Sequence, residues 1–401
     1  MPKLSSPAPS VPPCLRPESA AVWARLGNYV RRAERRTLLV IRHNSPRLPR
    51  ELPPLLAAES GRPLVNATVS DAEPDPMAAA LRAVPDGRFP ARAILSITGA
   101  EDLAITAPDG SRAALFEFAR RLDLRSDQFL PDGGLVLVWA TARVFDALAE
   151  HSLNFISRAA AVLTLAAAGE KTGLAPSGAP SISRESMQRR YAIPPLPPDA
   201  PAKMRAALGA FEELAVANEL YLQGGPRIAH ALAAYDAARD RIEAGWEAAR
   251  QFRTSESKAV KRLADALLAA FPIAGIHILS LRQGPREHIA WLEVALDAAR
   301  EIGDRRWEGV ALGNLALAHA DLGDARKAIA LCEQALVIAR DIGDRRGEAN
   351  ALFNSALQLE KLDQRADALA RAEQAAEIYA AIESPHTEQA RQLAARLRGG
   401  A

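Results

Sequence analysis

The sequence predicts an α/β N-terminal domain, with about five mostly parallel strands and flanking helices, followed by an all-α superhelix. Three observations predict this division. Short apolar runs alternate with helical segments over residues 37–165, a pattern typical of a parallel sheet with helices between its strands. A proline-rich run at residues 193–201 follows, and no strand pattern returns after it. Residues 302–308 then recur, with one substitution, at residues 342–348.

Composition limits the class of protein. The 401 residues suggest two or three domains, and 49% hydrophobic with 24% charged residues is typical of a globular chain. A net charge of +2 provides no general attraction for nucleic acid or for an anionic membrane. Two cysteines cannot form a disulfide framework, and residues 158–168, the most apolar stretch, are too short to cross a bilayer. We therefore expect a cytoplasmic protein without nucleic-acid or membrane partners.

The first half of the chain is predicted to contain a leader and one α/β domain. Residues 1–18 are rich in proline and are predicted to be a disordered leader. A helix is expected from Ser19 to about residue 36, since Ser19 can cap it. The predicted strands span residues 37–42, 63–69, 93–98, 134–139 and 161–165. The predicted intervening helices span residues 48–60, 77–83, 111–122 and 142–151. Continuous apolar strands imply a sheet covered on both faces, so residues 19–168 are expected to form one α/β domain.

Three further segments are predicted after this domain. Residues 169–201 are rich in glycine and proline and are expected to be an extended, semi-rigid linker. Residues 202–285 have helical composition without a clear repeat, and we expect them to continue the superhelix irregularly. Residues 286–401 contain the repeats and a final helix that is expected to cap the stack.

The repeat has a period of 40 residues. The shift relates Leu312 to Leu352 and Asn314 to Asn354, among other pairs. Each unit is predicted to contain two helices, at residues 306–321 and 325–342 in the first unit, separated at Gly323. Neither helix can bury its apolar face alone, so successive units must stack as a solenoid.

These residues resemble the tetratricopeptide repeat. The matching positions are Leu312, Leu315, Ala316, His319, Gly323, Ala328, Cys332 and Ala335, and then Leu352, Ser355, Ala356, Leu359, Asp363, Ala368, Ala372 and Ala375. The 40-residue variety is similar to the repeats of spindle-orientation adaptors, which share the tripeptide Leu312-Gly313-Asn314. It is also similar to the repeat sensors of bacterial signalling ATPases of the STAND type.

This resemblance implies a concave groove that binds an extended peptide. The matching groove positions are Asn314, Asn350, Asn354, Arg305, Arg306, Arg345 and Arg346. Asparagine amides can pair with a peptide backbone, and arginine can hold a carboxylate with two hydrogen bonds. The arginines have an equally plausible second role, because residues 304–305 and 344–345 can be turn and cap residues that form exposed ion pairs.

The N-terminal domain resembles a degenerate P-loop-like nucleotide-binding domain of the signalling ATPases, mainly over residues 133–142 and 147–155. A phosphate site requires a glycine-rich turn after the first strand. Residues 42–49 stand there instead, with two prolines, no glycine and no lysine. Glu101-Asp102 follows the third strand, roughly where such ATPases carry magnesium carboxylates, but the pair fits the start of a helix better.

These patterns favour a non-enzymatic adaptor or sensor that binds a protein or peptide partner. No catalytic, cofactor-binding or metal-binding residue is assigned, because the chain has no Gly-x-Ser-x-Gly, His-Glu-x-x-His or Cys-x-x-Cys motif. The alternative is a nucleotide-dependent switch of STAND-like ancestry. A DNA-binding regulator would need a basic recognition helix, which the sequence does not show.

Overall fold

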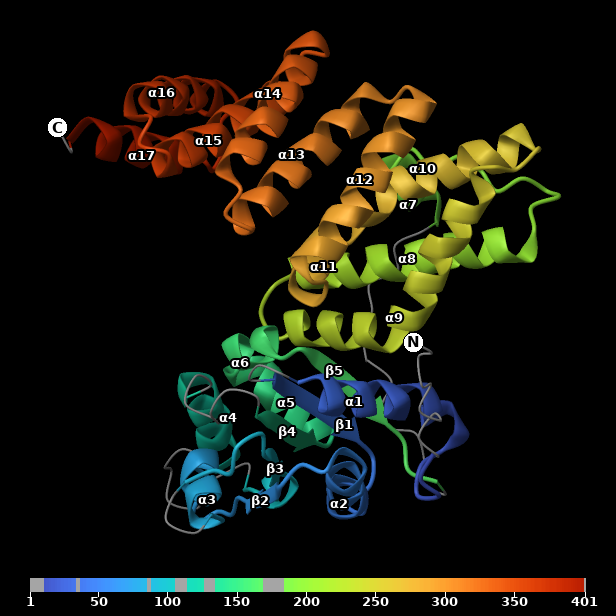
Figure 1. Ribbon diagram of the computed structural model, residues 1–401, viewed down its shortest axis with the longest axis vertical. Helices are drawn as coiled ribbons and strands as arrows, with labels where there is room; N and C mark the ends of the chain where they lie inside the picture. Colours follow the sequence, from blue (N-terminus) through green and yellow to red (C-terminus); the bar gives the residue numbers. More distant parts are fainter. Residues whose placement is uncertain are drawn as a thin grey trace, which may run out of the picture. The chain divides into compact units, whose positions relative to one another are not determined.

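The computed structural model describes residues 11–33, 37–84, 88–104, 114–125, 134–168 and 184–399. The chain divides into two compact units (Figure 1). The first unit contains Met1–Pro180 and Ala217–Arg239, and the second contains Ser181–Val216 and Asp240–Ala401.

The first unit is built on a five-stranded sheet in which all neighbouring strands are parallel. The strand order is β2-β3-β4-β1-β5. This order differs from the 3-2-1-4-5-6 order of dinucleotide-binding domains, because β1 lies between β4 and β5. Because all neighbouring strands are parallel, the predicted mainly parallel sheet is confirmed. The strands are β1 (Thr37–His43), β2 (Leu64–Thr68), β3 (Ile94–Thr98), β4 (Leu135–Ala140) and β5 (Ala161–Leu165).

Helices cover the sheet because both of its faces are apolar. Trp23 of α1 (Ala20–Arg32) and Leu52 of α2 (Leu48–Ser60) share a core with Leu137 and Trp139 of β4. Successive strand side chains point to opposite faces, so Val138 lies on the other face of the sheet. The helices on that face are α3 (Pro76–Arg82), α4 (Ala114–Arg125), α5 (Ala142–His151) and α6 (Leu153–Arg158). These helices contact one another, and α5 also contacts β1 and β4.

Two segments join the first unit where the sequence predicted otherwise. Residues 11–18 were expected to be disordered, but Leu15 is only 5% exposed and the Arg16 amide donates a hydrogen bond to the Ala166 carbonyl oxygen. Residues 217–239 were expected to belong to the superhelix. They pack instead with the sheet, where the Asp236 carboxylate accepts a hydrogen bond of 2.6 Å from the backbone amide of Val162 in β5. Both differences arise from burial against the edge strand, which composition does not encode.

The second unit begins with α7 (Arg184–Arg190) and a packed extended segment. It also includes parts of α8 (Ala202–Leu222) and α9 (Arg227–Phe252), followed by α10 (Lys258–Ala274), α11 (Ile276–Arg282) and α12 (Pro285–Ile302). Aromatic rings of α9, α10 and α12 pack together, with Trp246 stacked on Trp291 at a centroid distance of 4.3 Å. Phe271 lies edge-on to both rings.

Within the described part of the chain, no single helix is both long and apolar enough to cross a membrane. The helices α10 and α11, bent by 72° relative to each other, reach that length and apolarity only when taken together.

The predicted helical hairpins follow α12. They are α13 (Arg305–Asp321) with α14 (Ala325–Asp341), and α15 (Arg345–Lys361) with α16 (Arg365–Ala381). The helix α17 (Thr387–Gly399) packs against α16. Glycines at the turns adopt positive φ, and Gly303 and Gly343 both have φ of 71°. Residues other than glycine rarely adopt this backbone conformation. Asp304 and Asp344 then cap the next helix through their side chains.

Candidate functional site

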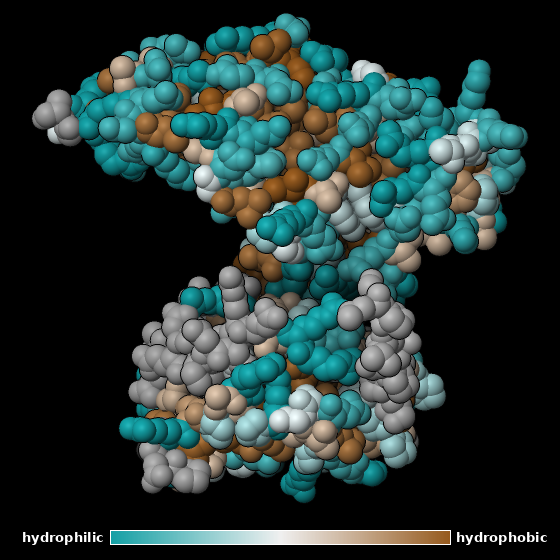
Figure 2. Space-filling view, viewed as in Figure 1, coloured by the Kyte–Doolittle hydropathy of each residue, from teal (hydrophilic) through white to brown (hydrophobic). Residues whose placement is uncertain are grey.

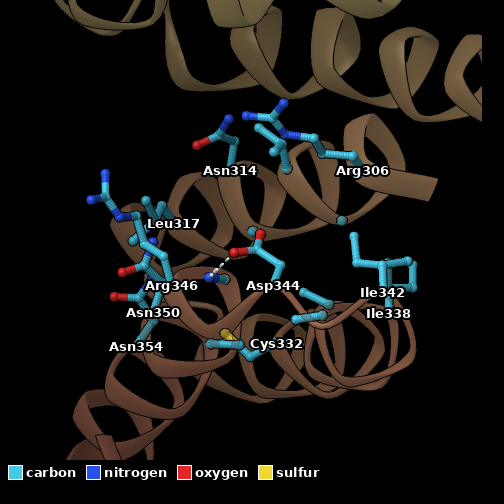
Figure 3. Close-up of a pocket in the computed structure, with 17 residues that line it drawn as sticks. Arg306, Asn314, Leu317, Cys332, Ile338, Ile342, Asp344, Arg346, Asn350 and Asn354 are labelled. Carbon is cyan, nitrogen blue, oxygen red and sulfur yellow. Dashed lines mark hydrogen bonds between the residues drawn. The ribbon is translucent and has the colours of Figure 1, made fainter. Parts of the chain in front are cut away.

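A groove of ≈ 500 Å³ lies between α13, α14 and α15 (Figure 3). We call it the repeat groove. Its floor comes mainly from small or apolar residues of α14, namely Cys332, Ala335, Ile338 and Ala339. Its polar lining comes from α13 and α15 and consists of Arg306, Asn314, Arg346, Asn350 and Asn354, with Asp344 just before α15.

Helical spacing brings the polar residues of the groove together. On α13, Arg306, Val310 and Asn314 are each four residues apart, which places them on one helix face. The 40-residue repeat places Arg346 and Asn354 at the equivalent positions of α15. Gly313 also lines the groove, and a Cβ atom added to it would meet no other atom within 4 Å, so this position borders open space.

The structure separates the two arginines of each predicted pair. Arg305 does not line the repeat groove. Its guanidinium donates to the Glu308 carboxylate at 2.6 Å, and Arg300 donates to the same carboxylate at 2.8 Å. The next junction repeats this arrangement. There, Arg340 and Arg345 donate hydrogen bonds of 3.0 Å and 2.5 Å to the Glu348 carboxylate.

These two carboxylates are the polar residues of the repeat that the sequence analysis missed. Glu308 and Glu348 are only 7% and 8% exposed. Burial alone raises the pKa of Glu308, but the hydrogen bonds from Arg300 and Arg305 outweigh it, so the pKa lies below its ordinary value. The signal was present in the sequence, because the glutamate and both of its arginines recur with the 40-residue period.

Arg306 and Arg346, in contrast, are exposed and line the repeat groove. Within the described residues, neither guanidinium makes a hydrogen bond or an ion pair. Among the described residues that line the groove, Asp344 is the one with an acidic side chain. One of its carboxylate oxygens already accepts the Gly347 amide at 2.9 Å to cap α15. The groove therefore carries an excess of positive charge.

The three asparagines line the same groove. The Asn350 side-chain oxygen accepts a hydrogen bond of 2.7 Å from the Tyr379 hydroxyl. Burial raises the pKa of Tyr379 to about 12, so the hydroxyl keeps its proton, and the amide nitrogen of Asn350 remains a donor for a ligand. The side-chain amides of Asn314 and Asn354 make no hydrogen bond to any part of the chain that the structure describes.

Apolar side chains complete the groove. Leu317 and Ile342 are 45% and 41% exposed, which is high for such large hydrophobic residues. In the space-filling view, hydrophobic side chains reach the surface among hydrophilic ones over the second unit (Figure 2). Burial raises the pKa of Cys332 to about 12. Its neutral thiol therefore contributes to the apolar floor and is not activated as a nucleophile.

The turn between β1 and α2 is the place where the alternative function would need a phosphate site. The Asn44 side-chain oxygen accepts the Ala167 amide at 2.8 Å. The Arg47 amide donates to the Ser45 hydroxyl, and the Leu48 amide donates to the Ser45 carbonyl. Pro46 has no amide hydrogen. Much of the hydrogen-bonding capacity of this turn is thus used within the protein.

The acidic pair Glu101-Asp102 lies in a short 3-10 helix at Ala100–Asp102, directly after β3. Arg143 donates a hydrogen bond to the Glu101 backbone carbonyl. Across the described part of the chain, no group of three histidine, cysteine, aspartate or glutamate residues is arranged to hold a metal ion.

Comparison with known proteins identifies the repeats. Residues 307–381 match the family model of the tetratricopeptide repeat, which confirms the predicted resemblance. No curated protein matches the chain.

Two of the solved structures that are similar to this chain have low sequence identity to it. One is BtubC (BKLC) from P. vanneervenii, at 14% identity and a TM-score of 0.29, over 50% of this chain and 94% of that one. The other is a Signal Transduction ATPase with Numerous Domains (STAND) protein with a tetratricopeptide repeat sensor from Pyrococcus horikoshii. It has 12% identity and a TM-score of 0.31, over 96% of this chain and 86% of that one. Both TM-scores are low, so these similarities support no conclusion about function.

Proposed function

We propose, on the premise that residues 307–381 are tetratricopeptide repeats, that this chain is a non-enzymatic adaptor or sensor. Its repeat groove would hold an extended segment of a partner protein. The observation that carries the proposal is the pair Arg306 and Arg346. These guanidinium groups occupy equivalent positions in successive repeats, line one groove, and make no ion pair within the described residues.

The chemistry of the groove indicates which segment it would accept. Two guanidinium groups without carboxylate partners favour acidic side chains, which they can hold with two hydrogen bonds each. The asparagine amides can pair with the backbone of an extended segment, and Leu317 offers it an apolar surface. The two arginines lie on α13 and α15, which contact each other. Packed helices are about 8–10 Å apart, so at about 3.3 Å per residue the two acidic residues would lie about three positions apart.

The test starts from selection of peptides from a random displayed library on the full chain. The affinity of the selected peptides is then measured for the wild type and for the double variants Arg306→Ala/Arg346→Ala and Asn314→Ala/Asn354→Ala. Each charged contact is expected to contribute about 1.5 kcal/mol, so the arginine double variant should bind at least about tenfold more weakly.

The matched control is Arg326→Ala. Arg326 is exposed on α14, lies outside the groove lining, and should leave the affinity unchanged. Selection of peptides without acidic residues, or equal binding by the wild type and both double variants, would contradict the proposed role of the groove.

A further inference from the structure

The proline-rich segment of the second unit has a defined conformation. We call residues 191–201 the proline strap. Its centre reads Ile193-Pro-Pro-Leu-Pro-Pro198, and the structure assigns no helix or strand to it. Proline holds its own φ near −65°, and a residue before proline is restricted to extended conformations. Residues 193–197 therefore have the dihedral preferences of a polyproline II helix, with three residues per turn.

Both ends of the strap are anchored in the second unit. The Tyr191 side chain is 8% exposed and lies edge-on to Phe211 at a centroid distance of 5.4 Å. Ile193 is 5% exposed, and its amide donates to the Gln188 carbonyl at 2.9 Å. At the other end, Ala200 is 2% exposed, and the Arg205 guanidinium of α8 donates a hydrogen bond to the Ala200 carbonyl oxygen. The strap is thus held in its extended form before any partner binds.

Exposure along the strap follows the period of the polyproline II helix. Pro195 and Pro198, which are three residues apart, are exposed, whereas Ile193 and Pro197 are buried. One edge of the helix therefore faces outward with two proline rings on it. Within the described residues, the carbonyl oxygens of residues 193–196 accept no hydrogen bond. Aromatic grooves that recognise such helices pack against their proline rings, and free carbonyl oxygens can accept hydrogen bonds from the groove.

The surface beside the strap is positively charged. A shallow hollow there is lined by Arg189, Lys258 and Arg262, with Glu185 as its one acidic side chain. Glu185 lies 3.4 Å from Arg189, so these two charges offset each other. Lys258 and Arg262 have no ion pair with any residue that the structure describes. A partner with acidic residues at the rim of its binding site would complement them.

We propose that the proline strap is a docking site for a partner domain with an aromatic-lined, polyproline-reading groove and an acidic rim. An SH3-type domain with acidic residues beside its aromatic groove has this chemistry. Because the strap is already ordered, binding would cost less conformational entropy than binding of a flexible proline-rich peptide. The site is separate from the repeat groove and does not depend on its proposed function.

The experiment titrates the full chain with a purified SH3 domain of that kind, followed by the fluorescence of the aromatic groove. We expect saturable binding with a micromolar dissociation constant. Pro195→Ala/Pro198→Ala should weaken it at least about tenfold. Lys258→Glu/Arg262→Glu should also weaken it. Added salt should weaken binding of the wild type but not of this variant, because salt screens attraction in the first and repulsion in the second. Far-UV circular dichroism and thermal unfolding of each variant verify folding.

Two control variants distinguish the outcomes. Pro226→Ala changes an exposed proline outside the strap, and Arg306→Ala/Arg346→Ala changes the repeat groove. Both should bind the SH3 domain as the wild type does. The inference is overturned if the folded wild type does not bind at millimolar concentration, or if Pro195→Ala/Pro198→Ala binds equally well. Loss of binding in the groove variant would also overturn it, because it would place the contact in the repeat groove.

Discussion

Replacing Glu308 by glutamine removes the negative charge that Arg300 and Arg305 share, while keeping a side chain of similar size. The side chain of Glu308 is 10% exposed, but those of its two arginines are 46% and 48% exposed. Breaking a fully buried ion pair costs about 3–5 kcal/mol, and exposed pairs contribute about 0.2–1 kcal/mol. The half-exposed arginines place the expected loss between these limits, at about 1–3 kcal/mol.

The assay is reversible denaturation of the full chain by urea and by heat. A loss of 2 kcal/mol corresponds to a fall of about 4–8 °C in the Tm of a unit of roughly 200 residues. Glu377→Gln is the matched control, since Glu377 is exposed on α16 and has no ion pair within the described residues. A loss below about 0.5 kcal/mol, or an equal loss in the control, would refute the structural role of this carboxylate.

The pH dependence provides a second readout of the same variant. The pKa of Glu308 is lowered in the folded chain from its ordinary value of 4.5. A lowered pKa means that the stabilisation is fully present above pH 4.5 and is lost as pH falls through the folded pKa. The difference in unfolding free energy between wild type and Glu308→Gln should therefore shrink below pH 4.5. A difference that stays constant down to acid pH would mean that shape, not charge, stabilises the junction.

Two further predictions concern other parts of the chain. A Cβ atom added at Gly275 would lie 2.6 Å from the Leu214 side chain, so Gly275→Ala should lower the unfolding free energy in urea by about 1–3 kcal/mol. The control is Gly209→Ala, which should be neutral or stabilising because a Cβ atom there would meet no atom within 4 Å. Equal effects of the two substitutions would contradict the close packing of Gly275 against Leu214. Calorimetry of the full chain with millimolar Mg-ATP and Mg-GTP should show no saturable heat, because the turn after β1 uses its polar groups internally. Saturable heat would revive the nucleotide-switch alternative.

Periodicity was the most informative feature of the sequence. The 40-residue shift predicted the hairpins of α13–α16, and the apolar runs predicted the strands to within a residue or two. The same reasoning could not separate Arg305 from Arg306. Neighbouring residues on a helix point about 100° apart, and only the position of the adjacent helices determines which one meets Glu308 and which one lines the groove.

Composition was less informative at the ends of the predicted domains. Proline-rich segments were expected to be a disordered leader and an extended linker. Leu15 and Ile193 are nevertheless buried. Leu15 joins the core that contains Leu163 and Leu165, which are distant in sequence. Residues 169–183 of the predicted linker lie outside the described residues.

Local order along the chain was therefore encoded in the sequence itself: parallel strands, paired helices, capped turns and the extended proline strap. These features depend on backbone preferences and on side chains a few residues apart, which a sequence displays directly. Tertiary structure alone decided which charges are neutralised at the repeat junctions and which face the repeat groove without a partner among the described residues. Such pairings join side chains from different helices, so they depend on how those helices pack.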